Sequence, residues 1–396
     1  MVAQSRVVWD RSFTAYDFGP THPMNPVRLD LTARLCEALG VFDDVELINP
    51  DVPGDELLEL VHDPAYIAQV KAASADPSVA DLDAGLGTED DPAFVGMHES
   101  SARIVAGTAE LCRQVLAGEI AHGVNFCGGL HHAMRDRASG FCIYNDIAVG
   151  IQTLLDAGVE RVAYVDVDVH HGDGVEKIFE SDPRVLTASI HENGRNLFPG
   201  TGWARDIGVG AGLGYAVNVA LPPGTRDSAW LRALRSAIVP VVRAFRPQVL
   251  VTQHGCDTHA EDPLAHLMLS VDAQREAMIQ MHELAHEICD GRWVALGGGG
   301  YELINVVPRS WTHLAAIAGH RPVPLTTTIP DAWNEHVDAT FGRPGPRRMG
   351  DLDPAEGGIW VQPWEMGYNP HSEVDRAIMA TREAIFGHWG LDVWYD

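Results

Sequence analysis

Two carboxylates and an imidazole follow directly after an apolar segment in the middle of the chain. The segment VAYV at 162–165 runs into Asp166, Asp168 and His170, which alternate with valines. Alternate side chains of an extended chain share one face, so these three polar groups should point the same way. Burying them together is costly unless a cation compensates their charge. The spacing therefore predicts a metal site.

Zinc is the metal that this donor set favours. A catalytic zinc ion binds imidazole nitrogen and carboxylate oxygen through three protein ligands and keeps one position open. Asp168 and His170 supply two such ligands, and Asp257, shortly after the apolar segment VLVTQ at 249–253, is the best candidate for the third. These ligand types also admit Fe²⁺. Helix-capping aspartates and a core histidine are the alternative interpretation, against which the combined pattern DxDxHHGDG argues.

Two adjacent histidines are the candidates for proton transfer. His131 and His132 lie in a glycine-rich segment after a short apolar run. Histidine is the natural general acid and base near neutral pH, although a surface or structural pair is the alternative. Two neighbouring rings need separate partners to divide their roles. Asp166 and Asp173 remain after the metal takes its ligands and could each hold one ring N–H.

Tyr301 follows a run of four glycines at 297–300. Glycine lets the backbone approach a ligand closely, and a phenol can donate a hydrogen bond to a developing oxyanion. A phosphate-binding loop is disfavoured because the GxGxxG spacing and the GK[ST] ending are missing. A purely structural turn remains the other interpretation.

Apolar segments of strand length alternate with helical patterns. We expect strands at 124–126, 162–165, 185–190, 249–253 and 293–296, and helices at 27–40, 97–118, 146–157, 227–245, 271–289 and 310–319. Asn145 or Asp146 is a suitable N-cap for the third helix, and Ser270 for the fifth. The alternation predicts an α/β fold with a parallel sheet covered on both faces. Since ligands bind at the carboxyl ends of such strands, the polar segments should meet in one crevice.

The last part of the chain has a different composition. Residues 320–365 are rich in proline and polar groups, and 372–389 has a helical pattern again. We expect an irregular extension that wraps the domain and ends in a helix. The predicted organisation is a catalytic domain at 1–320 and a C-terminal extension at 321–396 packed on the same domain.

Composition limits the class of protein. The 396 residues carry a formal net charge of −27, which disfavours direct nucleic-acid binding and favours solubility or attraction of lysine-bearing segments. No apolar run approaches the ~18 residues that span a bilayer, and the start MVAQSRVVWDRSF lacks a secretory apolar region. Six scattered cysteines without a CxxC pair fit reduced thiols. We expect a cytoplasmic protein without membrane contact. Its oligomeric state stays open.

Six motifs occur in the order of a known family. They are GGLHHA at 128–133, GFCIYND at 140–146, DVDVHHGDG at 166–174, FPGTG at 198–202, QHGCDTHAEDP at 253–263 and GGGGYE at 297–302. Residues 8–320 thereby resemble the class I-type histone deacetylase family of the arginase–deacetylase superfamily, with most similarity to its bacterial acetoin-utilisation (AcuC-type) branch. The resemblance implies a single-domain α/β fold with a mostly parallel eight-stranded sheet flanked by helices.

The resemblance also implies an activity: zinc-dependent hydrolysis of N-ε-acetyl-lysine in a protein or peptide, such as an acetyl-CoA synthetase or another metabolic protein. Asp168, His170 and Asp257 would bind zinc. His132 with Asp173 would be the general base and then the acid, His131 with Asp166 would support the transition state, and Tyr301 would polarise the acetyl carbonyl. The implied substrate contacts are Phe141 and Phe198 as tunnel walls, Gly140 at the floor, Leu264 at the rim, Gly299, and Asp90 on the substrate backbone.

Family members also bind potassium near the zinc. The matching positions are Asp166, Asp168, His170, Ser189 and Ile190, and a second, weaker site would involve Phe179, Asp182, Val185 and Tyr215. Asp182 replaces a hydroxyl residue of some relatives, which departs from that second pattern.

Three other functions compete. An arginase-like ureohydrolase with two manganese ions would need a second set of bridging carboxylates. An acetylpolyamine or other small-molecule deacetylase is disfavoured because the polyamine branch usually has PGHH where this chain has GGLHH. A non-catalytic acyl-lysine binding module would not need both histidines and Tyr301.

Overall fold

The computed structural model describes residues 5–195, 197–353, 355 and 357–396. Within these residues, one sheet has eight strands in the order β2-β1-β3-β8-β7-β4-β5-β6. The strands are β1 (Arg6–Val8), β2 (Glu46–Ile48), β3 (His122–Asn125), β4 (Val162–Asp166), β5 (Val185–Glu192), β6 (Ala216–Leu221), β7 (Val249–Gln253) and β8 (Trp293–Leu296). Every neighbouring pair in this sheet is parallel, so the predicted α/β class is confirmed.

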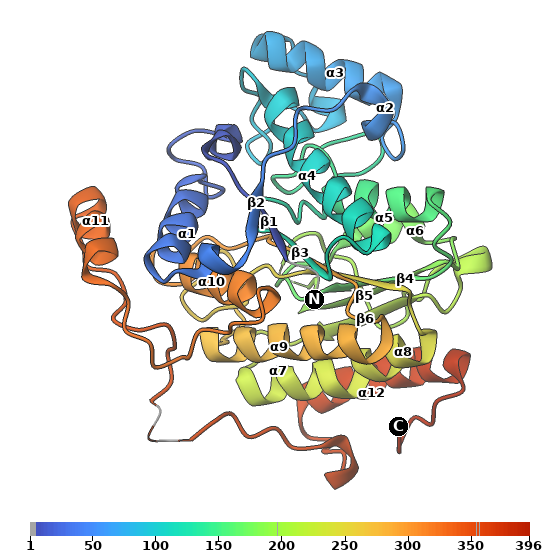
Figure 1. The fold of residues 1–396 in the computed structure, drawn as a ribbon. Coiled ribbons are helices and arrows are strands. Elements are labelled where there is room, and N and C mark those ends of the chain that lie inside the picture. The colour runs from blue at the N-terminus through green and yellow to red at the C-terminus, as the bar shows by residue number, and fades with distance from the viewer. Residues whose placement is uncertain (1–4, 196, 354, 356) are drawn as a thin grey trace.

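Helices cover both faces of the sheet (Figure 1). One layer contains α4 (Met97–Ala117) and α5 (Asp146–Asp156), and the other contains α9 (Val271–Ile288), α10 (Val307–Ala318) and α12 (Glu373–Ile385). Further helices are α1 (Val27–Ala38), α2 (Asp55–Leu58), α3 (Pro64–Ala75), α6 (Asp173–Phe179), α7 (Asp227–Ala233), α8 (Val239–Phe245) and α11 (Asp331–Phe341). Strands β3, β4, β5, β7 and β8 are buried along their whole length, because helices pack on both faces of a parallel sheet.

The predicted helix starts are capped by short polar side chains. Asn145 accepts a hydrogen bond from the backbone N–H of Ala148 at the start of α5, and Ser270 accepts one from Ala273 at the start of α9. Each cap satisfies an amide that has no partner inside its helix. The caps thereby fix where α5 and α9 begin.

The strand register places the carboxyl ends of the central strands at one level. Asp166 of β4 lies opposite Ser189 and Gln253, Gln253 lies opposite Leu296, and Leu296 lies opposite Asn125. The segments that follow β3, β4, β7 and β8 therefore leave the sheet side by side. As predicted, they meet at one edge.

Some sequence expectations differ from the structure. The helix expected at 227–245 is interrupted by a π-helical turn at Leu234–Ile238, which separates α7 from α8. The extension was expected to be irregular over 320–365, but it contains α11, whose Trp333 packs into the core and donates to the carbonyl of Leu31. This expectation was wrong because the amphipathic pattern of α11 is weak and lies between proline-rich segments.

The extension contacts the remainder of the chain at several points. Thr381 of α12 donates to the carbonyl oxygen of Asn218 in β6 at 2.6 Å. Asp351 lies 2.9 Å from the Nε2 of His259 and 2.7 Å from Arg309. The division at residue 320 stays a prediction.

Across the described part of the chain, no helix combines the length and apolarity that crossing a membrane requires.

Candidate active site and metal centre

Asp168, His170 and Asp257 come together beyond the carboxyl ends of β4 and β7. One ligand atom from each lies within 4.8 Å of the others, and all three residues are buried. The Nδ1 of His170 is 3.1 Å from Asp168 Oδ1 and 3.2 Å from Asp257 Oδ2. Two carboxylates and an imidazole in this arrangement form a suitable three-ligand set for zinc.

Neighbouring groups hold the two carboxylates in place. Asp168 Oδ2 accepts hydrogen bonds from Gln253 Nε2 at 2.7 Å and from the Gly299 amide at 2.8 Å, and Asp257 Oδ1 accepts one from the Val169 amide at 2.9 Å. A Cβ at Gly299 would overlap the Asp257 carboxylate, so this position requires glycine. Sequence reasoning missed Gln253 as a positioning residue, although it begins the motif QHGCDTHAEDP. Such hydrogen bonds orient metal ligands.

The electrostatics of this group call for a cation. Burial opposes a charge on His170, yet its hydrogen bonds and charge interactions with Asp168 and Asp257 raise its pKa to about 10. Burial and the charge of Asp168 raise the pKa of Asp257 to about 8. The local potential is thus strongly negative, and a divalent ion would compensate it while keeping the imidazole neutral. The donor set and its surroundings fit zinc.

The two adjacent histidines have separate carboxylate partners. His131 Nδ1 lies 2.7 Å from Asp166 Oδ2, and His132 Nδ1 lies 2.6 Å from Asp173 Oδ1. The Nε2 atoms of the two histidines are 3.0 Å apart, so one of them donates to the other. This pairing is the one implied by the family resemblance.

The partners shift the pKa values of the two rings in opposite directions. Burial opposes protonation of His131, but Asp166 and Asp168 outweigh it and raise its pKa to about 9. Burial and the neighbouring charge of His131 lower the pKa of His132 to about 4, against the pull of Asp173. A cationic ring therefore lies beside a neutral one, which is the arrangement that an electrostatic role and a base role require.

A narrow cavity of about 200 Å³ leads to the histidines. Its lining consists of Asp90, His132, Gly140, Phe141, His170, Leu197, Phe198, Leu264 and Tyr301. Phe198 lies edge-on to His132 with 4.9 Å between ring centroids, and Phe141 lies edge-on to Tyr301 at 5.7 Å. Every cavity residue expected from the sequence except Gly299 is in this lining. Leu197 was missed because nothing marks it apart from its neighbour Phe198.

Tyr301 enters the cavity from the glycine run after β8. Its amide donates to Asp262 Oδ2 at 2.8 Å, which ties the tyrosine to the loop that follows Asp257. Burial and the charges of Asp257 and Asp168 raise the pKa of Tyr301 well above its ordinary value. The phenol therefore stays protonated and can donate a hydrogen bond. Asp262 was a second positioning residue that sequence reasoning missed.

His22 contacts two residues of the cavity lining, Asp90 and Phe141. Asp90 is exposed, and its backbone oxygen lies 3.1 Å from His22 Nε2. The His22 ring contacts Phe141 edge-on at 4.6 Å between centroids. Phe141 itself has a φ of 68°, and Tyr16 donates to its carbonyl at 2.7 Å. The hydroxyl thus holds an otherwise unfavourable backbone conformation that turns the ring toward the cavity.

Two of the side chains expected to bind potassium already have polar partners in the protein. Ser189 lies opposite Asp166 in the sheet, and its Oγ is 2.8 Å from His191 Nδ1. At the second position, Asp182 pairs with Arg184 at 2.6 Å. Potassium binding at either place stays a prediction.

This sheet, with its polar site at the carboxyl edge, has the arginase–deacetylase fold. Structural neighbours agree: an HDAC homolog complexed with SAHA has a TM-score of 0.80 at 28% identity, covering 96% of this chain and 100% of that one. An HDAC homolog from Aquifex aeolicus has a TM-score of 0.81 at 27% identity, with the same coverage.

The histone deacetylase domain matches residues 22–318, and the chain belongs to the histone deacetylase family. It is 41% identical to the acetoin utilization protein AcuC of Bacillus subtilis over 347 residues, 84% of this chain and 90% of that protein. AcuC of Staphylococcus xylosus is 38% identical over 82% of this chain and 85% of its own length. The chain is thus of the class I, AcuC-like type, and these relationships support deacetylase activity.

Proposed function

We propose that the protein is a zinc-dependent lysine deacetylase that hydrolyses the amide of N-ε-acetyl-lysine in proteins or peptides. One observation carries the proposal: the lining of the cavity with aromatic walls includes His132 and also His170, one of the three candidate metal ligands. The lining of this cavity supports the substrate class. A slot between Phe141 and Phe198 suits a slim aliphatic stem with a neutral amide at its tip.

Asp168, His170 and Asp257 would hold the ion, which is Zn²⁺ by donor type, with Fe²⁺ as an alternative. Such an ion lowers the pKa of water and polarises an amide carbonyl. The remaining steps belong to the side chains around it. Potassium held at the Ser189 and Asp166 positions would add positive potential near these ligands.

Proton transfer is the task of His132. The Nε2 of this ring would take a proton from the attacking water while Asp173 stabilises the charge that forms. His131, held by Asp166, would add positive potential beside the reacting carbon. The Tyr301 hydroxyl would donate to the oxyanion. His132 then returns the proton to the lysine nitrogen as the C–N bond breaks, which gives acetic acid and the lysine amine. A proton then passes from the acid to the amine, so the final products are acetate and the lysine ammonium group.

The protein substrate is the finer part of the proposal. By analogy with the family, it would be an acetylated metabolic enzyme such as an acetyl-CoA synthetase, encountered in the cytoplasm. The net charge of −27 favours lysine-bearing protein segments as partners over nucleic acid.

The test is hydrolysis of a fluorogenic acetyl-lysine peptide by protein of known metal content. We expect turnover that a chelator abolishes and added Zn²⁺ restores. N-acetylputrescine serves as the competing substrate. Turnover of the acetylpolyamine alone, or binding of the peptide without any hydrolysis by zinc-loaded protein, would contradict the proposal.

A further inference from the structure

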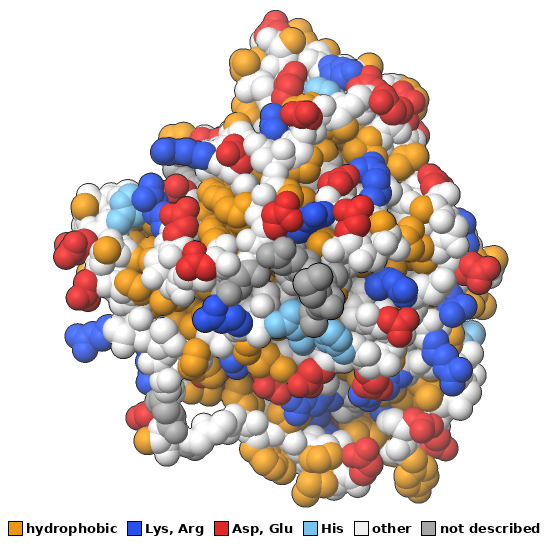
Figure 2. Space-filling model, viewed as in Figure 1, with side chains coloured by type: hydrophobic (Ala, Val, Ile, Leu, Met, Phe, Trp, Pro, Cys, Tyr) orange, Lys and Arg blue, Asp and Glu red, His pale blue; other side chains and the backbone are white. Residues whose placement is uncertain are grey.

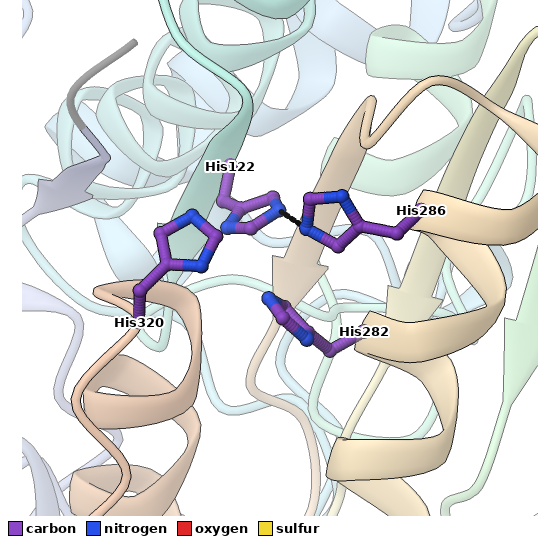
Figure 3. A group of neighbouring side chains, drawn as sticks. All are labelled: His122, His282, His286 and His320. Atoms are coloured by element: carbon purple, nitrogen blue, oxygen red, sulfur yellow. Dashed lines mark hydrogen bonds between the residues drawn. The ribbon is translucent and has the colours of Figure 1, made fainter. Parts of the chain in front are cut away.

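Four histidines form a second cluster away from the active site (Figure 3). His122 is the first residue of β3, His282 and His286 lie on α9, and His320 follows the end of α10. One ring nitrogen of each lies within 4.8 Å of those of the other three. Their rings face a common centre (Figure 3). Among the described residues, no carboxylate belongs to this group of candidate ligands.

The secondary structure explains the convergence. His282 and His286 are four residues apart on α9, so they project from the same face of the helix. His122 lies opposite Trp293, the first residue of β8, which places the cluster at the amino-terminal edge of the sheet. The active site lies at the carboxyl edge, and the four-residue strand β3 alone separates the two edges by about 10 Å. The cluster is therefore not part of the catalytic group.

His122 is oriented as a metal-binding histidine would be. Its Nδ1 lies 2.8 Å from the carbonyl oxygen of Ala318, so Nδ1 carries the proton and donates it. The lone pair of Nε2 then points toward the cluster, where it lies 3.1 Å from Nε2 of His286. A backbone carbonyl that fixes the tautomer in this way is the usual outer partner of a metal-ligating imidazole.

The cluster also favours neutral imidazoles, which are the form that binds metals. Burial and the neighbouring histidines lower the pKa of His122 to about 3 and that of His282 to about 4. The Nε2 of His282 is buried and has no hydrogen-bond partner among the described residues. A metal ion would satisfy this nitrogen.

An ion can reach the cluster from solvent. His286 and His320 are exposed, and histidine side chains gather at the surface near the middle of the face in Figure 2. Behind them, Trp293 packs against the rings of His122 and His282 at 5.6 and 5.7 Å between centroids. The cluster is thus open to solvent at His286 and His320 and packed against the apolar ring of Trp293 at His122 and His282.

We propose that His122, His282, His286 and His320 bind a second divalent transition metal ion. Imidazole donors without oxygen ligands select zinc and its first-row neighbours over Mg²⁺ and Ca²⁺. Zinc–nitrogen bonds of about 2.0–2.1 Å place tetrahedral ligand atoms about 3.3 Å apart. The ring nitrogens lie within 4.8 Å of one another, so the most widely spaced pair needs to approach by at most about 1.5 Å. The ion would tie β3 and α9 to the point where the C-terminal extension begins, and so stabilise the fold independently of the reaction.

Metal counting tests the proposal. After chelator treatment, Zn²⁺ is added back and weakly held ions are removed by dialysis. We expect two zinc ions per chain in the wild type, one in the exposed double variant His286→Gln/His320→Gln, and one in Asp257→Ala. Combining all three substitutions should leave none. The double variant should keep its acetyl-lysine turnover, but zinc should raise its Tm by several degrees less than it raises the Tm of the wild type.

A matched control and a spectrum make the result specific. His371→Gln/His388→Gln removes two exposed histidines of the C-terminal extension and should still bind two ions. Co²⁺ in Asp257→Ala should show the visible bands of a four-coordinate nitrogen site, and these bands should vanish when His286 and His320 are also replaced. No zinc ion in Asp257→Ala, or two in His286→Gln/His320→Gln, would overturn the proposal and leave the cluster as packing only.

Discussion

Asp173→Asn tests the division of roles between the two active-site histidines. Asp173 Oδ1 lies 2.6 Å from His132 Nδ1, and the exposed fractions of their side chains are 12% and 5%. Asparagine keeps the size of the side chain but removes its negative charge. Its amide N–H can also face Nδ1, which would hold His132 in the opposite tautomer. The substitution therefore acts on the base without touching a candidate metal ligand.

The magnitude follows from the burial of this pair. Opposite charges about 4 Å apart attract by about 4 kcal/mol at an effective dielectric constant of about 20. This attraction exists only when His132 carries the proton, as it does in the transition state. Because asparagine still offers a hydrogen-bond acceptor, we expect the barrier to rise by about 3 kcal/mol. That rise corresponds to a decrease in kcat of about 10²-fold, with little change in KM.

The assay is steady-state hydrolysis of an acetyl-lysine peptide by protein of verified zinc content. Asp156→Asn, at the exposed end of α5, is the matched control and should keep normal kcat. Thermal unfolding of each variant checks that the fold is intact. If folded, zinc-loaded Asp173→Asn turned over within about fivefold of the wild type, Asp173 would not support the base and the assignment of His132 would fail.

Other substitutions probe the oxyanion donor, the metal and the extension. Tyr301→Phe should lower kcat by about 10²–10³ while zinc content stays normal, and near-normal turnover would exclude the hydroxyl as a donor. Asp257→Ala should lose the active-site zinc in metal analysis, so full occupancy there would remove Asp257 from the ligand set. Burial opposes ionisation of Asp351, but the hydrogen bond with His259 and the charge of Arg309 outweigh it and hold its pKa far below the ordinary 3.8. The stability that this ion pair adds is thus present above about pH 4 and lost as the pH falls further. Asp351→Asn should reduce the free energy of unfolding by about 2 kcal/mol at pH 7 and by less near pH 3, measured by urea titration. An equal loss at both pH values would contradict the ion-pair account.

Much of the candidate site could be predicted because its residues follow strand segments in short motifs. Asp166, Asp168 and His170 are close in sequence, so their proximity is local and follows from the extended backbone. Asn145 and Ser270 marked helix starts for an equally local reason, since a cap acts on amides within three residues. The parallel sheet followed from the alternation of strand and helix patterns.

Other features of the fold lacked a local signal. The edge strands β1 and β2 have three residues each, too few for a clear pattern. The sequence of β6, AVNVAL, has no chemical group at its end that would draw attention to it. The helix α11 contributes only Trp333 and Val337 to the core, so its amphipathic pattern is weak.

By itself, the sequence determined which residue types could bind a metal and move protons, and that strand ends would deliver them to one edge of a sheet. Only the tertiary structure decided which carboxylate holds which ring, because Asp166 and Asp173 are about equally close in sequence to both histidines. It also brought His122 beside His286 and His320, residues more than 150 positions away along the chain. Contacts of that range depend on strand order and register, which side-chain periodicity does not encode.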